Sequence, residues 1–156
     1  MNLSTKAVLA FLACPGVVAG LAPVLIARTC PGDGRFRDAS FVPLAIGALG
    51  LLWCVRDFFV RGRGTLAPWD PPKRLVVSGL YRRVRNPMYL SVLAIILGWS
   101  FYFGTWRLAL YLGVVAVGSH LRVTLGEEPR LRAQFGPEWD RYARSVPRWI
   151  PRLRAR

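Results

Sequence analysis

Residues 86–106, NPMYLSVLAIILGWSFYFGTW, contain no charged residue. A helix over 87–106, with Pro87 in its first turn, is long enough to cross a hydrocarbon layer of about 30 Å. A second apolar run follows Arg107, and residues 107–126 can form another span if the arginines near its ends reach the headgroups. Only Phe103-Gly104-Thr105-Trp106 is available as a turn. The two spans are therefore predicted to form a helical hairpin.

Two further stretches have the same apolar character. Residues 7–27 carry no charge and are predicted to form a membrane helix with a kink near Pro15 or Pro23. A cleaved signal peptide is the competing interpretation, but the run is longer than the apolar part of such a peptide. Residues 41–60 form the remaining span, with the Arg56–Asp57 pair near the headgroups. We therefore expect a single all-α domain over residues 1–156, a polytopic membrane protein with about four transmembrane helices.

The charges are few, mostly basic, and lie between the spans. The chain is 53% hydrophobic and has 22 Lys or Arg against 8 Asp or Glu, a net charge of +14. Soluble chains this basic usually bind nucleic acid, but they are not this apolar, so no nucleic-acid partner is expected. The basic residues concentrate in the loop 61–86 and the tail 127–156, which the positive-inside rule places in the cytoplasm together with both termini. The high proportion of arginine over lysine suits a bacterial gene, which points to a bacterial cytoplasmic membrane with anionic lipids as partners.

The tail has an amphipathic pattern. Large apolar residues follow one another at helical spacing: Leu131, Phe135, Trp139, Tyr142 and Val146. Gly136-Pro137 divides the pattern into two short helices. We expect cytoplasmic C-terminal amphipathic helices, which in the simplest alternative lie on an anionic leaflet without any catalytic role.

Two adjacent acidic residues, Glu127 and Glu128, lie where the fourth span is predicted to leave the membrane. Their carboxylates repel each other unless a cation is near. Neutralisation by Arg122, Arg130 or Arg132 is one explanation, and a binding site for a cation or a polar cofactor is the other. The three cysteines and the single histidine have no metal-ligand spacing, so no metal site is predicted.

Two blocks of sequence flank the hairpin and carry a resemblance. Gly79-Leu80-Tyr81 followed by Arg85-Asn86-Pro87-Met88-Tyr89 resembles the Gly-x-Tyr-x-x-x-Arg-His-Pro-x-Tyr block of the isoprenylcysteine carboxyl methyltransferase and phospholipid methyltransferase superfamily. Glu127-Glu128, Phe135-Gly136-x-Glu138-Trp139-x-x-Tyr142 and Val146-Pro147-x-x-Ile150-Pro151 resemble its C-terminal block. The resemblance extends over about residues 73–152, with both blocks in the family's order.

The resemblance implies methyl transfer from S-adenosylmethionine at the cytoplasmic membrane face. The acceptor would be a carboxylate, amine or thiol on a hydrophobic or lipid-linked molecule that enters from the bilayer. No Gly-x-Gly-x-x-Gly motif is present, so a Rossmann-type cofactor domain is not expected. For an in-line displacement at a sulfonium methyl group, the protein mainly aligns donor and nucleophile and excludes water.

The resemblance also assigns roles by position. The cofactor-binding residues would be Tyr81, Arg85, Asn86, Pro87, Tyr89, Glu127, Glu128 and Tyr142. Arg85, Glu128 and Arg144 would be catalytic, and His120 and Arg148 would contact the acceptor. Simpler alternatives stay open, since Arg85 could anchor to lipid phosphate, and Tyr89 and His120 could be ordinary interfacial residues.

The chain departs from the family pattern at two positions. Asn86 occupies the place of the usual histidine, and Ser145 precedes Val146-Pro147 where many members have arginine, with Arg144 and Arg148 on either side. Two other functions remain open. One is an NADPH-dependent membrane sterol or steroid reductase, which shares a related Arg-x-Pro-x-Tyr block, and the other is a small non-catalytic membrane subunit. The C-terminal block favours the methyltransferase.

Overall fold

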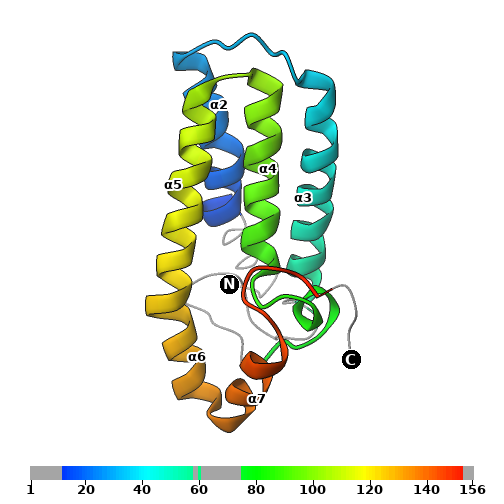
Figure 1. The fold of residues 1–156 in the computed structure, drawn as a ribbon, viewed down its shortest axis with the longest axis vertical. Helices are drawn as coiled ribbons and strands as arrows, with labels where there is room; N and C mark the ends of the chain where they lie inside the picture. Colours follow the sequence, from blue (N-terminus) through cyan, green and yellow to red (C-terminus); the bar gives the residue numbers. More distant parts are fainter. Residues whose placement is uncertain (1–11, 58–59, 61–74, 153–156) are drawn as a thin grey trace.

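The structure is a computed structural model that describes residues 12–57, 60 and 75–152. Within these residues every regular element is a helix and no β-strand is present, which confirms the all-α prediction for this part of the chain (Figure 1). The first helix, η1 (Leu12–Leu21), is π-helical and continues as α2 (Ala22–Thr29). The helices α3 (Arg37–Asp57), α4 (Pro87–Phe103) and α5 (Trp106–Arg122) run alongside it in one bundle.

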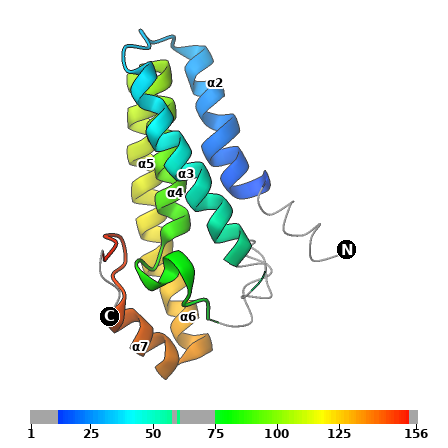
Figure 2. The ribbon, with the colours of Figure 1, turned by 90° about the vertical axis from the view of Figure 1, so that its right-hand side faces the viewer.

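The helix that begins with α5 continues beyond the bundle. It passes through a π-helical stretch, η4 (Val123–Glu127), into α6 (Glu128–Phe135), so one helical rod runs from Trp106 to Phe135. The predicted boundary at residue 126 is therefore not a break in the helix. After Gly136 the chain turns into α7 (Pro137–Ser145), as predicted. The single turn η3 (Gly79–Arg82) lies at the same end of the bundle, which we call the α7 end (Figure 2).

Among the described residues, two helices are long and apolar enough, by length and composition, to cross a membrane: Arg37–Asp57 and Trp106–Phe135. The apolar helices Pro15–Thr29 and Pro87–Phe103 are shorter. α4 ends at Phe103, before the predicted boundary at residue 106, because Gly104 adopts a left-handed conformation with φ of 65° and closes the helix. α5 then begins at Trp106, so the predicted hairpin is confirmed. Residues 7–11 and 58–59 of the predicted spans lie outside the described residues.

α4 is the central helix and packs against η1, α2, α3 and α5. Its contact with α3 is close because small residues meet there: Gly47 lies against Ser91 and Ile95, and Gly98 lies against Leu44. Small residues allow two backbones to approach closely. The van der Waals packing that results is a main source of attraction between helices in apolar surroundings. Ile96 on α4 is fully buried at the centre of this packing.

Pro23 explains two hydrogen bonds that join the first helix to the others. Because Pro23 has no N–H, it cannot donate to the carbonyl groups one turn earlier, at Ala19 in α-helical or Val18 in π-helical geometry. Trp99 Nε1 on α4 donates to Ala19 O, and Tyr111 OH on α5 donates to Val18 O, both at 2.9 Å. The neighbouring helices thus satisfy carbonyl groups that would be costly to leave unpaired in apolar surroundings.

The apolar face of the tail is buried within the protein. Trp139, Tyr142 and Val146 form a buried cluster, against which Leu131, Phe135 and Leu75 pack. The predicted periodicity is therefore confirmed. The cluster is covered by the segment that precedes η3, so this face is not free to lie on a leaflet as the simplest alternative supposed.

Gly47→Ala is expected to destabilise the bundle. An added methyl group would lie 2.6 Å from Cγ1 of Ile95 and 2.7 Å from the carbonyl O of Ser91, so α3 and α4 would have to separate. Overpacking of this kind costs about 1–3 kcal/mol, measurable by thermal unfolding in detergent. Gly113→Ala on α5 is the matched control, since nothing lies within 4 Å of a methyl group there. Equal unfolding midpoints for the two variants would contradict the packing argument.

Candidate functional site

Two segments far apart in the sequence lie side by side at the α7 end: residues 83–89 and residues 146–152, which we call the C-terminal segment. The backbone N–H of Arg85 donates to the carbonyl O of Pro147 at 2.9 Å, and that of Arg152 donates to the carbonyl O of Arg83 at 3.0 Å. Pro147 cannot continue α7, but its carbonyl group remains able to accept. The two sequence blocks that flank the hairpin therefore form one structural unit.

Asn86 stands at the N-cap position of α4, but its side chain does not cap the helix. Its Nδ2 instead donates to the carbonyl O of Arg148 at 3.2 Å, which joins the start of α4 to the C-terminal segment. A histidine ring also carries a donor N–H. The departure from the family's histidine thus keeps a hydrogen-bond donor at this position.

Glu128, the first residue of α6, is bound by two arginines from two other segments. Arg85 Nη1 donates to Oε1 at 2.8 Å, and Arg148 donates through Nε and Nη2 to Oε1 and Oε2 at 2.8 and 2.7 Å. The side chains of Arg85 and Glu128 are only 13% and 16% exposed, so the network is largely buried. The hydrogen bonds to Glu128 raise the pKa of Arg148, which therefore remains cationic.

Glu127 has separate partners. Tyr89 OH donates to its Oε1 at 2.5 Å, and Arg122 Nε donates to the same oxygen at 2.9 Å. Of the three arginines considered as neutralising partners, Arg122 is thus confirmed, whereas Arg130 is exposed and Arg132 pairs with Asp140 at 3.1 Å. Each glutamate therefore belongs to its own network.

Local helix geometry separates the two carboxylates. Successive residues of a helix lie about 100° apart around its axis, so Glu127 and Glu128 cannot face the same partners. The rod is also widened to π-helical geometry through η4, which ends two residues before Pro129, whose missing N–H interrupts the regular ladder. π-helical turns are frequent at functional sites, and this one lies directly at the acidic pair.

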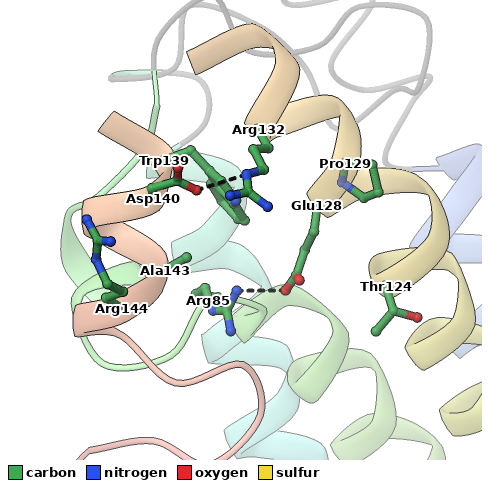
Figure 3. A pocket seen from close by; sticks show the side chains of 9 residues that line it. All are labelled: Arg85, Thr124, Glu128, Pro129, Arg132, Trp139, Asp140, Ala143 and Arg144. Carbon is green, nitrogen blue, oxygen red and sulfur yellow. Dashed lines mark hydrogen bonds and ion pairs between the residues drawn. The ribbon is translucent and has the colours of Figure 1, made fainter. Parts of the chain in front are cut away.

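Two cavities meet at Glu128 and share Arg85, Glu128 and Trp139. The inner cavity, of about 100 Å³, is also lined by Tyr81, Asn86, Tyr89, Glu127 and Tyr142. The outer pocket, of about 490 Å³, lies between α6 and α7 and is also lined by Thr124, Pro129, Arg132, Asp140, Ala143 and Arg144. Figure 3 shows Arg85 pointing toward Glu128 in the outer pocket. Within the described residues the buried Nε of Arg85 has no hydrogen-bond partner, so it can donate to a ligand.

Two tyrosines form a rigid wall of the inner cavity. Tyr142 OH donates to the carbonyl O of Tyr81 at 2.8 Å. Burial raises the pKa of the Tyr142 phenol and raises that of Tyr81 well above its ordinary value. Both phenols therefore stay neutral, and the hydrogen bond that joins α7 to η3 persists at any physiological pH.

A third hollow, the lateral groove, opens between η1, α4 and α5. Its volume is about 410 Å³, and its lining is mostly apolar, with Val18, Val92, Tyr111 and Val115 along its length. Tyr89, Arg122 and Glu127 supply polar groups to this lining. Met88, Tyr89 and Glu127 line both the lateral groove and the inner cavity, so these residues form the wall between the two.

The structure gathers most of the predicted site residues around the inner cavity. Tyr81, Arg85, Asn86, Tyr89, Glu127, Glu128 and Tyr142 all line it. Pro87 instead lines an apolar groove between α3 and α4, because the start of the helix turns it away from the cavity. Arg144 is exposed at the outer pocket and does not bind Glu128, whereas Arg148 does. His120 accepts a hydrogen bond from Trp149 Nε1 at 3.1 Å and lines neither cavity nor the lateral groove.

Some lining residues were not predicted. Trp139 belongs to both cavities, and its ring centre lies 5.9 Å from the guanidinium carbon of Arg85. Its place in the C-terminal block was a usable signal, although the helical spacing placed it only on the apolar face. Arg132 was expected only as a possible partner of the acidic pair, and nothing in the sequence marked Thr124 or Asp140 as lining residues. Across the described ranges, no three His, Cys, Asp or Glu side chains are grouped so that they could hold a metal ion.

Comparison with known proteins identifies the family. The chain is 29% identical to the nickel-cobalt-cadmium resistance protein NccN of Alcaligenes xylosoxydans xylosoxydans over 139 residues, which cover 83% of this chain and 61% of that protein. The chain thus spans less than two thirds of this relative's length. No solved structure matches. Residues 44–138, which include Arg85 and the acidic pair and make up more than half of the chain, match the phospholipid methyltransferase family. The chain therefore belongs to the phospholipid methyltransferase family.

Proposed function

We propose that this protein is an integral membrane methyltransferase that uses S-adenosylmethionine to methylate a hydrophobic or lipid-linked acceptor. Its family is a family of methyltransferases. The observation that carries the proposal is the position of Glu128, which lies between the inner cavity and the outer pocket in contact with Arg85 and Arg148. Arg85 comes from the first of the two sequence blocks that resemble the superfamily, and Glu128 and Arg148 come from the second.

The residues around Glu128 fit the chemistry of S-adenosylmethionine. The buried Nε of Arg85 is a donor for a carboxylate, and the two glutamates can accept from an ammonium group or from ribose hydroxyls. Trp139 offers an aromatic surface to a purine ring. The outer pocket, at about 490 Å³, lies within the range of about 300–1,000 Å³ usual for small-molecule sites. When bound, S-adenosylmethionine supplies a methyl group on a positively charged sulfur.

The chain's own contribution is alignment and exclusion of water. Arg85 and Arg148 hold the Glu128 carboxylate from two sides, and Tyr89 and Arg122 hold that of Glu127. Groups fixed in this way need no rearrangement during the reaction. The lateral groove suits a hydrocarbon chain, which would bring the acceptor to the wall formed by Tyr89 and Glu127. Either glutamate could also accept a proton from an amine or thiol acceptor.

We further infer four transmembrane helices within one domain, residues 1–156: the helix formed by η1 and α2, then α3, α4 and α5. α4 has 17 residues, about 26 Å, which is short for a hydrocarbon layer of about 30 Å. A modest local thinning of the bilayer accommodates such a difference. The basic loop and tail support a cytoplasmic location of the α7 end in a bacterial membrane, next to anionic lipids.

Replacing Glu127 and Glu128 together by glutamine is expected to weaken binding of S-adenosylmethionine by about 1–3 kcal/mol, because charge-assisted hydrogen bonds are lost while shape is kept. Isothermal titration of the purified protein measures the change. Glu138→Gln, exposed on α7, is the control. Unchanged affinity for S-adenosylmethionine in a folded double variant would mean that the two glutamates have only a structural role. A parallel titration with NADPH tests the reductase alternative, and binding of neither cofactor would favour a non-catalytic subunit.

Arg85→Lys is expected to reduce methyl transfer at least tenfold, about 1.4 kcal/mol in the activation barrier. Lysine keeps the charge but cannot both bind Glu128 and present a second donor in the fixed geometry of the guanidinium. Transfer of a labelled methyl group to a total lipid extract is the measurement. Arg82→Lys and Arg83→Lys are matched controls, since both side chains are exposed. Equal turnover in all three variants would mean that Arg85 serves only as a basic anchor.

Reporter fusions test the orientation. Fusions at Arg63 and Arg156 are expected to report a cytoplasmic location, because both lie in the most basic segments. A reporter inserted at Gly34, in the connection between α2 and α3 at the opposite end of the bundle, is expected to report the outside (Figure 1). A cytoplasmic signal at Gly34, or an outside signal at either other site, would rule out the four-span arrangement.

A further inference from the structure

The C-terminal segment contains a side chain that the proposed function leaves unused. Trp149 donates its Nε1–H to Nδ1 of His120 on α5 at 3.1 Å. Its ring also meets the ring of Tyr89 on α4 edge to face, with centres 6.3 Å apart and planes at 74°. Trp149 therefore bridges α4 and α5 from a segment that belongs to neither helix.

Tyr89 connects this bridge to the site. Its hydroxyl donates to Glu127 Oε1 at 2.5 Å, and both residues belong to the wall between the inner cavity and the lateral groove. A short hydrogen bond at one end of the Tyr89 side chain fixes the hydroxyl but leaves the ring free to tilt. The edge-to-face contact with Trp149 favours one ring orientation over others. The two contacts together define the position of the wall.

We propose that Trp149 is a positioning residue: anchored by His120, it fixes the Tyr89 ring and thereby the Tyr89–Glu127 wall between the cavity for the cofactor and the groove for the acceptor. This inference rests on the proposed function, which supplies the two ligands on either side of the wall. It also gives His120 a different role from the predicted contact with the acceptor, because the imidazole acts on the wall through Trp149.

The anchor depends on an acceptor in the side chain of residue 120. Nδ1 of His120 accepts the hydrogen bond from Trp149 Nε1. The side-chain oxygen of an asparagine can take the place of Nδ1 as acceptor, whereas a leucine offers none. Loss of the acceptor is therefore expected to release Trp149 from α5.

Tryptophan fluorescence of the full-length protein without cofactor tests the anchor. The chain has six tryptophans, so the emission of Trp149 is obtained as the difference between a protein and its Trp149→Phe counterpart. In His120→Leu, which has no acceptor, this difference is expected to shift relative to the wild type. In His120→Asn, where Oδ1 replaces Nδ1 as the acceptor, it is expected to match the wild type. The same emission with leucine as with histidine would overturn the anchor.

Cofactor affinity and methyl transfer test the positioning role. Trp149→Phe keeps a ring against Tyr89 but loses the indole N–H and part of the ring area, so either quantity is expected to fall by roughly two- to tenfold. Trp106→Phe is the matched control, because Trp106 is 66% exposed at the start of α5 and is expected to show no change. His120→Leu is expected to show a loss similar to that of Trp149→Phe, and His120→Asn is expected to restore the acceptor and match the wild type.

The outcomes separate this inference from the proposed function. If Trp149→Phe behaves like Trp106→Phe, or if His120→Leu and His120→Asn have the same affinity, the positioning role is overturned. If the wild type binds no S-adenosylmethionine at all, the proposed function fails, and with it the positioning role. The fluorescence measurement then still decides whether His120 anchors Trp149.

Discussion

The ion-pair network at Glu128 is the contact on which the α7 end of the molecule depends. It joins the start of α6, the residue before the N-cap of α4, and the C-terminal segment. Taking these charges out of water costs free energy that their attraction offsets only when every hydrogen bond is made, so such a network adds little net stability. If one partner is missing, the others are left as buried charges. The network therefore requires all three segments to be in place together, and this gives the cavities around Glu128 a defined shape.

The parts of this arrangement that could be predicted are those that depend on short-range sequence. The helices α3, α4 and α5 follow from long runs without charge, and the turns at Gly104 and Gly136 follow from residues that end helices. The apolar spacing from Leu131 to Val146 correctly placed these side chains in one cluster. Most of the residues that the resemblance named also lie together around the inner cavity, because the two blocks that contain them meet at the α7 end.

The parts that could not be predicted depend on register and on contacts between segments. The π-helical geometry of η4 shifts which faces Glu127 and Glu128 present, and no spacing rule in the sequence indicates it. The choice between Arg144 and Arg148 is decided by the end of α7, which leaves Arg144 on an exposed face and directs Arg148 to Glu128. In the same way, the role of His120 depends on Trp149, a residue that no periodicity connects to it.

The adjacency of Glu127 and Glu128 has a consequence for a reaction between two bound molecules. Because they are successive residues of one helix, their side chains leave it in different directions while their backbones stay fixed relative to each other. Glu128 lines the outer pocket and the inner cavity, and Glu127 lines the inner cavity and the lateral groove. A polar cofactor and a lipidic acceptor need opposite surroundings, yet must meet within bonding distance for methyl transfer. A single helical turn that directs one carboxylate toward each compartment meets both requirements. It keeps the polar surroundings of the cofactor apart from the apolar surroundings of the acceptor, while the reacting ends of the two molecules stay close together.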